Sequence, residues 1–240
     1  MYIKIFYSDY WHNFFMITTA QILGQNTEHL VVCQHNHLLH PQVCKSFKRM
    51  QHAASGDGIN MQIASSHRDF ARQALIWQRK WQGQLPLYNL TGELLESSVL
   101  SEGEKMHAIL TWSALPGTSR HHWGTDLDVY DSDAIEASGA KLQLLSAEYA
   151  ENGPCFALNC WLGENAEKFG FSRPYQHYKG GVAAEAWHLS YQPIAREIFA
   201  ELDVDIIRKN LAQTDLSGKD TILANLDMIF NRYVKNKGEI

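Results

Sequence analysis

The sequence predicts an α+β fold in a single domain, with a central antiparallel sheet flanked by helices. Helical periodicity comes first along the chain, strand-like segments lie in the middle, and helical periodicity returns at the end, an order typical of α+β folds. No glycine-rich phosphate loop follows a predicted strand, which argues against a nucleotide-binding α/β fold. At 240 residues with 45% hydrophobic residues, the chain is long enough to bury a substantial core.

Two helices are predicted in the first third of the chain. In residues 41–54 the apolar residues recur at intervals of four and three, and Pro41 suits a first helical turn. A second helix is predicted from Asp69 to Gly83, because large apolar residues recur there at intervals of four, three and four. These intervals place the apolar residues of each helix on one face.

Short strands are predicted at 61–66, 125–130 and 187–191, with a loop at 113–118 that contains a Pro-Gly pair. After Pro193 apolar residues again recur at helical spacing, and Ser217 with Asp220 resembles a capping box that starts the last helix. We divide the chain into three parts on this basis. They are an N-terminal extension and lead-in (1–40), a main domain (41–208), and a C-terminal helical segment packed on that domain (209–240).

Composition excludes several classes of function. The net charge of −5 with no basic stripe argues against a nucleic-acid partner, and no apolar run is long enough for a membrane span. The first residues make a poor signal peptide, and Met16 is an alternative start. We therefore expect a cytoplasmic protein, with a periplasmic location as the alternative. The sequence does not indicate an oligomeric state.

The four cysteines do not form a disulfide scaffold or a CxxC motif. They are Cys33, Cys44, Cys155 and Cys160. We expect mostly buried thiols, although Cys155 and Cys160 are close enough in the sequence to pair in an oxidising compartment.

The phrases SRHHWGTDLD (119–128) and EAWH (185–188) bring together residues that suit a metal site. The candidate ligands are His121 or His122, Asp126 or Asp128, and His188. A catalytic zinc takes three such ligands and keeps a fourth position for water. Gly124 allows a sharp turn between the histidines and the aspartates. Glu185 is three residues before His188, where it could take a proton from that water.

Other polar or aromatic groups have structural interpretations. The segment HNHLLH (35–40) looks like a metal cluster, but nothing nearby completes one, and we interpret it as a turn before a helix. Trp77, Trp81 and Trp112 are expected in the core, and Trp187 is expected to pack under the site.

Three motifs resemble the VanY-type zinc D-alanyl-D-alanine carboxypeptidases, which are related to the VanX dipeptidases and share a fold with lysostaphin-like enzymes and the hedgehog domain. The first is S-x-H-x-x-G-x-x-x-D, and the second is E-x-W-H. They correspond here to Ser119, His121, Gly124, Asp128, Glu185, Trp187 and His188. The third is SSHRDFARQ, which matches the family phrase at Ser65 or Ser66, Arg68 and Gln73. The three motifs lie in the family order over residues 65–191.

The resemblance implies a role for each matching residue. It implies Zn²⁺ bound by His121, Asp128 and His188, with Glu185 as general base and Arg68 stabilising the developing oxyanion. We expect Ser119, Gln73 and Asp126 to contact the substrate. Asp126 stands where the family usually has a small residue, so an extra carboxylate is expected near the metal. His122 is expected to be a neighbour of the ligands rather than a ligand.

The implied function is hydrolysis of the terminal peptide bond of peptidoglycan stem peptides, most simply D-Ala-D-Ala. One alternative with the same chemistry is an L,D-carboxypeptidase or a peptidoglycan endopeptidase. Another is a hedgehog-like module that binds zinc without turnover, although such a module has no need of a base at Glu185.

Overall fold

The computed structural model describes residues 17–237. The alternative start at Met16 and most of the first half of the predicted 1–40 extension lie outside these residues. Within them, the centre of the molecule is a four-stranded antiparallel sheet in the order β3-β6-β8-β7. The strands are β3 (Met61–Ser65), β6 (Asp126–Asp131), β8 (His188–Tyr191) and β7 (Phe171–Ser172). The predicted antiparallel sheet is therefore confirmed, and the three predicted strands agree with β3, β6 and β8 to within one residue at each end.

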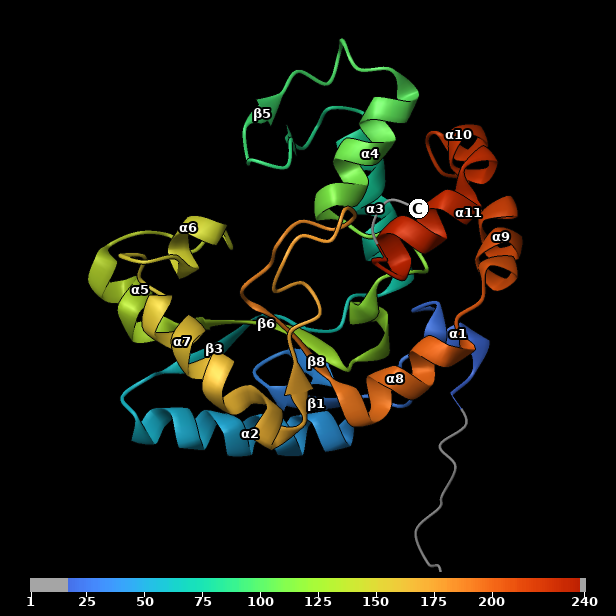
Figure 1. Cartoon of the computed structure of the whole chain (residues 1–240). Coiled ribbons are helices and arrows are strands. Elements are labelled where there is room, and N and C mark those ends of the chain that lie inside the picture. Colours follow the sequence, from blue (N-terminus) through green and yellow to red (C-terminus); the bar gives the residue numbers. More distant parts are fainter. Residues whose placement is uncertain (1–16, 238–240) are drawn as a thin grey trace, which may run out of the picture.

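The two faces of this sheet differ in chemistry because side chains alternate along a strand. Leu127 and Val129 of β6 are fully buried in a cluster that also contains Phe47 of α2 (Pro41–Gly56). The alternate β6 residues, Asp126 and Asp128, lie on the opposite face. The helix α2 runs along the apolar side of the sheet (Figure 1).

A second cluster of buried residues is formed mainly by helices. It joins α3 (Phe70–Trp81), α4 (Glu102–Trp112), α8 (Gln192–Glu201) and α9 (Val204–Ala212) with the C-terminal α10 (Lys219–Ala224) and α11 (Leu226–Ile229). In Figure 1, α4, α10 and α11 lie at the top of the view and α2 lies at the bottom. The C-terminal helices therefore pack against α3 and α4 in one core.

The remaining elements are short. They are α1 (Thr19–Ile22), the hairpin β1 (Val31–Gln34) and β2 (His37–Leu39), the hairpin β4 (Leu87–Tyr88) and β5 (Leu94–Leu95), α5 (Ser132–Ser138), α6 (Ser146–Tyr149), α7 (Phe156–Asn165), the 3-10 turns η1 (Arg120–Trp123) and η2 (Ala166–Phe169), and the π turn η3 (Phe230–Val234).

Local capping explains where the main helices begin. Asp69 caps α3 by accepting a hydrogen bond from the Arg72 backbone at 2.7 Å. The helix α4 was not predicted, although Ser101 and Glu104 form its capping box. The predicted cap at Ser217 is wrong. Gly218 takes that position in a left-handed conformation, and a Cβ there would lie 2.1 Å from the Trp81 ring.

The predicted cysteine thiols need a correction. Cys33 and Cys44 form a disulfide between β1 and α2, with 5.4 Å between their Cα atoms, because the β1–β2 hairpin places the strand beside the helix. Cys155 is a buried free thiol and Cys160 an exposed one, so the two do not pair. The sequence does not reveal this hairpin, and so it does not reveal the disulfide.

The segment 35–40 forms the hairpin turn, β2 and the N-cap of α2, where the His40 ring accepts a hydrogen bond from the Gln42 backbone. The predicted turn before a helix is present there.

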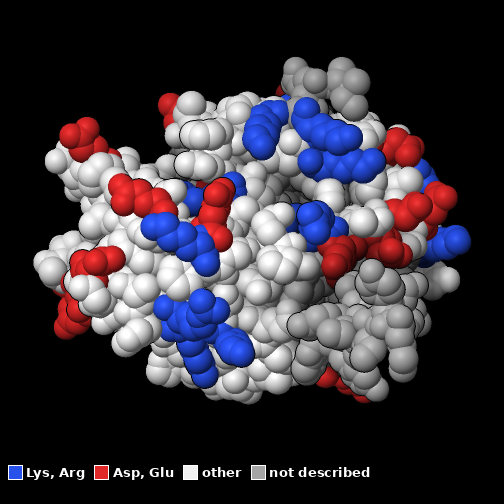
Figure 2. All heavy atoms as spheres, turned by 60° about the horizontal axis from the view of Figure 1, so that its bottom comes forward, with Lys and Arg blue, Asp and Glu red and all other residues white. Residues whose placement is uncertain are grey.

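No helix among residues 17–237 has the length and apolar character needed to cross a membrane. In Figure 2, basic and acidic side chains form separate small groups on this face.

Candidate metal centre and active site

Three elements bring the predicted metal ligands together. His121 lies in η1, Asp128 in β6 and His188 in β8, and Asp128 is directly opposite His188 in the β6–β8 ladder. Gly124 makes the turn between η1 and β6 in a left-handed conformation, with φ of 68°. A Cβ at Gly124 would lie 2.3 Å from Leu30, so glycine is required for the close packing as well as for the turn.

The ligand atoms of these three residues all lie within 4.8 Å of one another. The Asp128 carboxylate is central, with 3.4 Å from Oδ2 to His121 Nε2 and 3.1 Å from Oδ1 to His188 Nδ1. Among residues 17–237 this is the one group of three or more such side chains close enough to hold a metal ion. HNHLLH at 35–40 forms no such group.

The second nitrogen of each imidazole is held by a hydrogen-bond partner. His121 Nδ1 lies 2.9 Å from the Ser66 carbonyl, and His188 Nε2 lies 3.0 Å from Asp126 Oδ1. Since both partners are acceptors, each ring can donate a hydrogen bond there, which leaves the nitrogen that faces Asp128 as the one that could bind a metal when it carries no proton. This arrangement is typical of metal-binding histidines.

The three side chains differ in how their surroundings shift their pKa values. Burial lowers the pKa of His188, but hydrogen bonds to Asp126 and Asp128 outweigh burial and raise that pKa to about 10. Burial by itself would raise the pKa of Asp128. The nearby His121, His188 and Arg68 outweigh burial and hold this pKa below its usual value, so the carboxylate stays charged. Burial lowers the pKa of His121 to about 4, which keeps its ring neutral and able to bind a metal.

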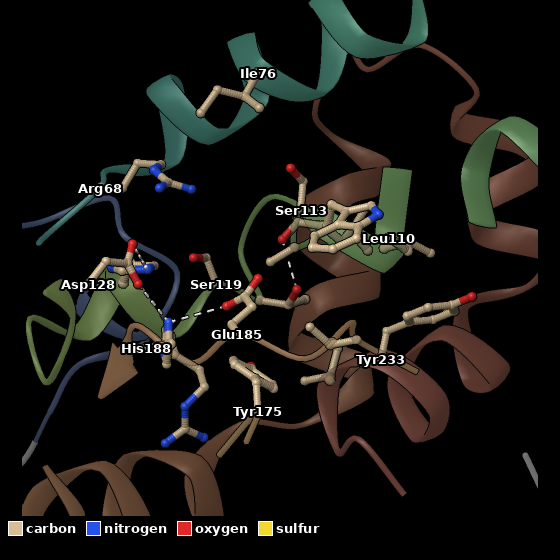
Figure 3. A pocket seen from close by; sticks show the side chains of 18 of the residues that line it. Arg68, Ile76, Leu110, Ser113, Ser119, Asp128, Tyr175, Glu185, His188 and Tyr233 are labelled. Atoms are coloured by element: carbon tan, nitrogen blue, oxygen red, sulfur yellow. Dashed lines mark hydrogen bonds and ion pairs between the residues drawn. The ribbon is translucent and has the colours of Figure 1, made fainter. Parts of the chain in front are cut away.

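Glu185 lies at the same place but outside the ligand group. Its Oε2 is 3.6 Å from His188 Nδ1, and Figure 3 shows its carboxylate directed toward His188 from the middle of the cavity. Burial raises the pKa of Glu185 to about 7, although His188, Arg68 and Lys80 act in the opposite direction. A carboxylate with such a pKa can accept a proton and release it near neutral pH.

Arg68 follows β3, precedes α3 and lines the cavity. Its Nη1 donates to Gln73 Oε1 at 2.8 Å, and Gln73 Nε2 donates to the Ala114 carbonyl at 2.7 Å. Gln73 is fully buried and does not line the cavity, so the expected substrate contact stays a prediction that this position does not support. Gln73 instead positions Arg68. A glutamine five residues after Arg68 could either contact the substrate or hold Arg68 in place, so the motif alone did not distinguish these two roles.

Asp126 also differs from the expectation that it contacts substrate. It is fully buried on the far side of the His188 ring, where it accepts hydrogen bonds from Arg120 Nε at 2.7 Å, Thr125 and Ser190. The predicted extra carboxylate near the metal site is present, but it positions His188. Arg120 was missed from the sequence. The sequence did contain an indication of this pair. Arg120 is the one Arg or Lys in the SRHHWGTDLD phrase, and a buried Asp126 that is not a metal ligand requires a cation as its partner.

His122 is buried and directed away from the candidate metal ligands. Its Nδ1 lies 2.6 Å from the Arg68 carbonyl, and its Nε2 accepts a hydrogen bond from the Gly117 backbone at 3.1 Å. Both nitrogens are thus occupied by backbone groups, which makes His122 a neighbour that supports the site.

A cavity of about 280 Å³ opens beside the three ligands. Ser119 and Trp187 both line this cavity, and the expected contact of Ser119 with the substrate stays a prediction. The opposite wall is formed by residues of α4 and the C-terminal segment, among them Leu110 and Tyr233 (Figure 3). Trp112 packs against the core cluster, as expected, and one part of it also lines the cavity. The motifs did not indicate this second wall.

A sequence profile of the VanY family, described as D-alanyl-D-alanine carboxypeptidase, matches residues 36–194. The chain belongs to this family. The match contains all three predicted motifs, so the VanY resemblance is confirmed. Family membership makes this VanY protein a peptidase, and it supports the coarse prediction of a peptidoglycan peptidase.

Individual relatives cover different parts of this VanY chain. An uncharacterized protein from Haemophilus influenzae is 32% identical over 131 residues, which are 54% of this chain and 99% of that protein. A D-alanyl-D-alanine carboxypeptidase from Enterococcus faecalis is 30% identical over 142 residues, 58% of this chain and 42% of that protein. The solved structure of the LdcB LD-carboxypeptidase has a TM-score of 0.50 at 21% identity, covering 71% of this chain and 72% of that chain. The last likeness concerns the fold alone.

Proposed function

We propose that this VanY protein is a zinc carboxypeptidase that removes the terminal residue of peptidoglycan stem peptides ending in D-Ala-D-Ala. The observation that carries the proposal is the convergence of His121, Asp128 and His188 beside Glu185 at the cavity. The family description and the Enterococcus faecalis relative support D-Ala-D-Ala as the terminal pair.

The donor set fits Zn²⁺. Two imidazole nitrogens and one carboxylate oxygen face one point, and their other polar atoms are occupied by Ser66 and Asp126. These three groups would hold the ion through His121 Nε2, Asp128 and His188 Nδ1. When bound, Zn²⁺ lowers the pKa of a water molecule and polarises a carbonyl group.

The protein groups supply proton transfer and charge stabilisation. Glu185 takes a proton from the attacking water as the C–O bond forms, and it gives a proton to the leaving amine as the C–N bond breaks. Arg68 donates hydrogen bonds toward the carbonyl oxygen, where negative charge develops. Because Gln73 holds the guanidinium, Arg68 has little freedom to lose when the reaction begins.

We also propose that the protein works in an oxidising compartment, the alternative to the cytoplasmic location expected from the sequence. The support is the Cys33–Cys44 disulfide, since such bonds persist mainly in secreted and periplasmic proteins. Alkylation of the denatured chain at the moment of cell lysis, followed by mass spectrometry, tests this by counting the cysteines that were free. Two alkylated cysteines per chain support the proposal, and four contradict it.

The test of the main proposal combines metal analysis with peptide hydrolysis. We expect one zinc per chain in the purified protein and a large loss of zinc in His188→Ala. Purified protein is assayed against pentapeptide ending in D-Ala-D-Ala, tetrapeptide and cross-linked fragments. Preference for the pentapeptide supports the proposal, whereas preference for the tetrapeptide or cross-linked fragments assigns L,D-carboxypeptidase or endopeptidase activity.

Glu185→Gln separates catalysis from metal binding. The amide keeps the shape of the side chain but cannot take a proton, so zinc is retained while turnover falls by about 10² to 10⁴. Glu164→Gln, an exposed change on α7, is the control and leaves turnover unchanged. Full activity in Glu185→Gln would assign Glu185 a structural role. A zinc-loaded wild-type protein that hydrolyses none of the fragments would favour the zinc-binding module.

A further inference from the structure

A second cleft lies directly beside the catalytic cavity. It has a volume of about 270 Å³ and is lined by residues of α8, the segment after β7 and the C-terminal turn η3. Arg120, Tyr175 and Val234 line both hollows, so these three side chains are a shared wall. A substrate that extends from the catalytic cavity past this wall would reach the second cleft.

The cleft is basic in a chain whose net charge is −5. Its lining includes Arg120, Lys179, Arg196 and Lys235 and contains no aspartate or glutamate. We call it the basic cleft. These cations come from four separate segments of the sequence, so no single helix or loop accounts for the grouping.

Three of these cations have no acidic partner among residues 17–237. No ion pair or side-chain hydrogen bond joins Lys179 or Arg196 to another described residue, and the Lys235 ammonium contacts only the Phe230 ring, at 4.7 Å. Elsewhere on the surface Arg208 does pair with Asp227 at 3.0 Å. Cations that share one hollow without a carboxylate repel one another, and an anion bound between them removes that repulsion.

Arg120 connects the basic cleft to the chemistry of the first site. Its Nε donates to Asp126 at 2.7 Å and its Nη2 donates to Ser190, while its Nη1 has no hydrogen-bond partner among the described residues. An arginine side chain keeps its positive charge in proteins. One face of the guanidinium is therefore held in place while another nitrogen remains able to donate.

We propose that the basic cleft binds an anionic group of the substrate away from the bond that is cleaved. This inference rests on the proposed peptidase function and extends it to substrate recognition. The chemistry required is a group of negatively charged oxygens, which a carboxylate side chain of the peptide or a phosphate attached to it can supply. Guanidinium and ammonium groups bind both, through charge-assisted hydrogen bonds.

The experiment uses a cleft variant, Lys179→Gln/Arg196→Gln, and a control, Lys48→Gln/Arg49→Gln. The control removes one Lys and one Arg from exposed positions of α2, on the other side of the sheet, and so changes the net charge equally. Neither variant alters Arg120 or a group placed in the catalytic machinery. Zinc content and circular dichroism are compared first, to establish that both variants fold and hold metal alike.

The first arm measures equilibrium binding of inorganic pyrophosphate by calorimetry at low salt. We expect binding to weaken roughly tenfold in the cleft variant, the scale of losing a hydrogen bond to a charged group, and to stay unchanged in the control. Any pyrophosphate bound at the metal is equal in both variants and cancels. This arm does not require turnover, so it succeeds or fails independently of the proposed peptidase function.

The second arm measures hydrolysis of paired peptides with glutamate or glutamine at one position before the cleaved bond. We expect the wild type to prefer the glutamate peptide through a lower KM, and the cleft variant to lose that preference by roughly tenfold with kcat unchanged. If only pyrophosphate binding responds, the anionic group is a phosphate. If neither arm separates the cleft variant from the control, the proposal is overturned, whatever the peptidase activity.

Discussion

Asp126 and Asp128 lie two residues apart on one face of β6, yet their surroundings differ. Asp128 is next to the cavity, where its two oxygens lie near His121 and His188. Asp126 is fully buried and accepts hydrogen bonds from Arg120, Thr125 and Ser190 in addition to its contact with His188. The His188 ring lies between the two carboxylates.

The difference shows how a single strand can hold both a ligand and its support. The oxygens of Asp128 face only histidine nitrogens that suit a metal, so a cation can join them. The oxygens of Asp126 are already occupied by donors, so this carboxylate can orient His188 but has no capacity left for substrate. We call His121, Asp128, His188, Glu185 and Arg68 the cavity-facing group. We call Asp126, Gln73 and His122 the supporting group.

Among the variants that compare the two groups, Arg68→Ala in the cavity-facing group has the largest expected effect. In Arg68→Ala we expect turnover to fall by about 10² to 10³, the scale of losing one oxyanion donor, while zinc content and folding stay normal. Arg68→Lys should also lose turnover, because a planar fork is replaced by a point charge. The control is Arg72→Ala, an exposed change on α3. Unchanged kcat with a raised KM would instead assign Arg68 to substrate docking.

Gln73→Ala tests whether the supporting group acts through the cavity-facing one. Without Gln73 Oε1 the guanidinium is held less firmly, so turnover should fall less than in Arg68→Ala. In Arg68→Ala/Gln73→Ala the second change should add little, since its effect passes through Arg68. Additive losses would show that Gln73 acts independently of Arg68.

A smaller effect is expected from Asp126→Asn. The amide can turn its oxygen toward only one of its donors, so His188 is oriented less firmly and zinc affinity should fall by about 10-fold to 100-fold. Competition with a chelator measures this, with exposed Asp133→Asn as the control. If affinity is unchanged and only the free energy of unfolding falls, Asp126 serves to pair Arg120 and does not support the metal site.

The residues of the cavity-facing group form spaced motifs of the kind that a metal site requires, and the structure brings them together at one cavity, while their roles stay predictions. The same reasoning failed to distinguish Gln73 and Asp126 from substrate contacts, since a motif marks which residues are needed but not where their polar atoms point. Arg120 has its partner Asp126 six residues away, and sequence spacing does not show such a pair. The second wall, with Trp112 and Tyr233, depends on how α4 and η3 pack, which is a property of the whole fold.

The smallest expected effect concerns His122, whose neutral ring links the Arg68 and Gly117 backbones. Burial lowers its pKa to about 3 from the ordinary value of 6.5. The unfolded chain therefore binds a proton at this residue below about pH 6.5, while the folded chain does not. The stability from a neutral His122 is complete above that pH and is lost as the pH falls, by about 1 kcal/mol between pH 7 and 5.5.

Urea unfolding at both pH values should show this loss as a difference between wild type and His122→Gln. The variant has no imidazole to protonate, so its free energy of unfolding should fall less on acidification, by about 1 kcal/mol. His52→Gln, an exposed change on α2, controls for the loss of a histidine and should follow the wild type. If wild type and His122→Gln lose stability in parallel, the ring carries a proton in the folded state. A protonated ring could not accept the hydrogen bond from the Gly117 backbone. The support that His122 gives would then come from its packing against Gly24, where a Cβ added to the glycine would lie 2.4 Å from the His122 ring.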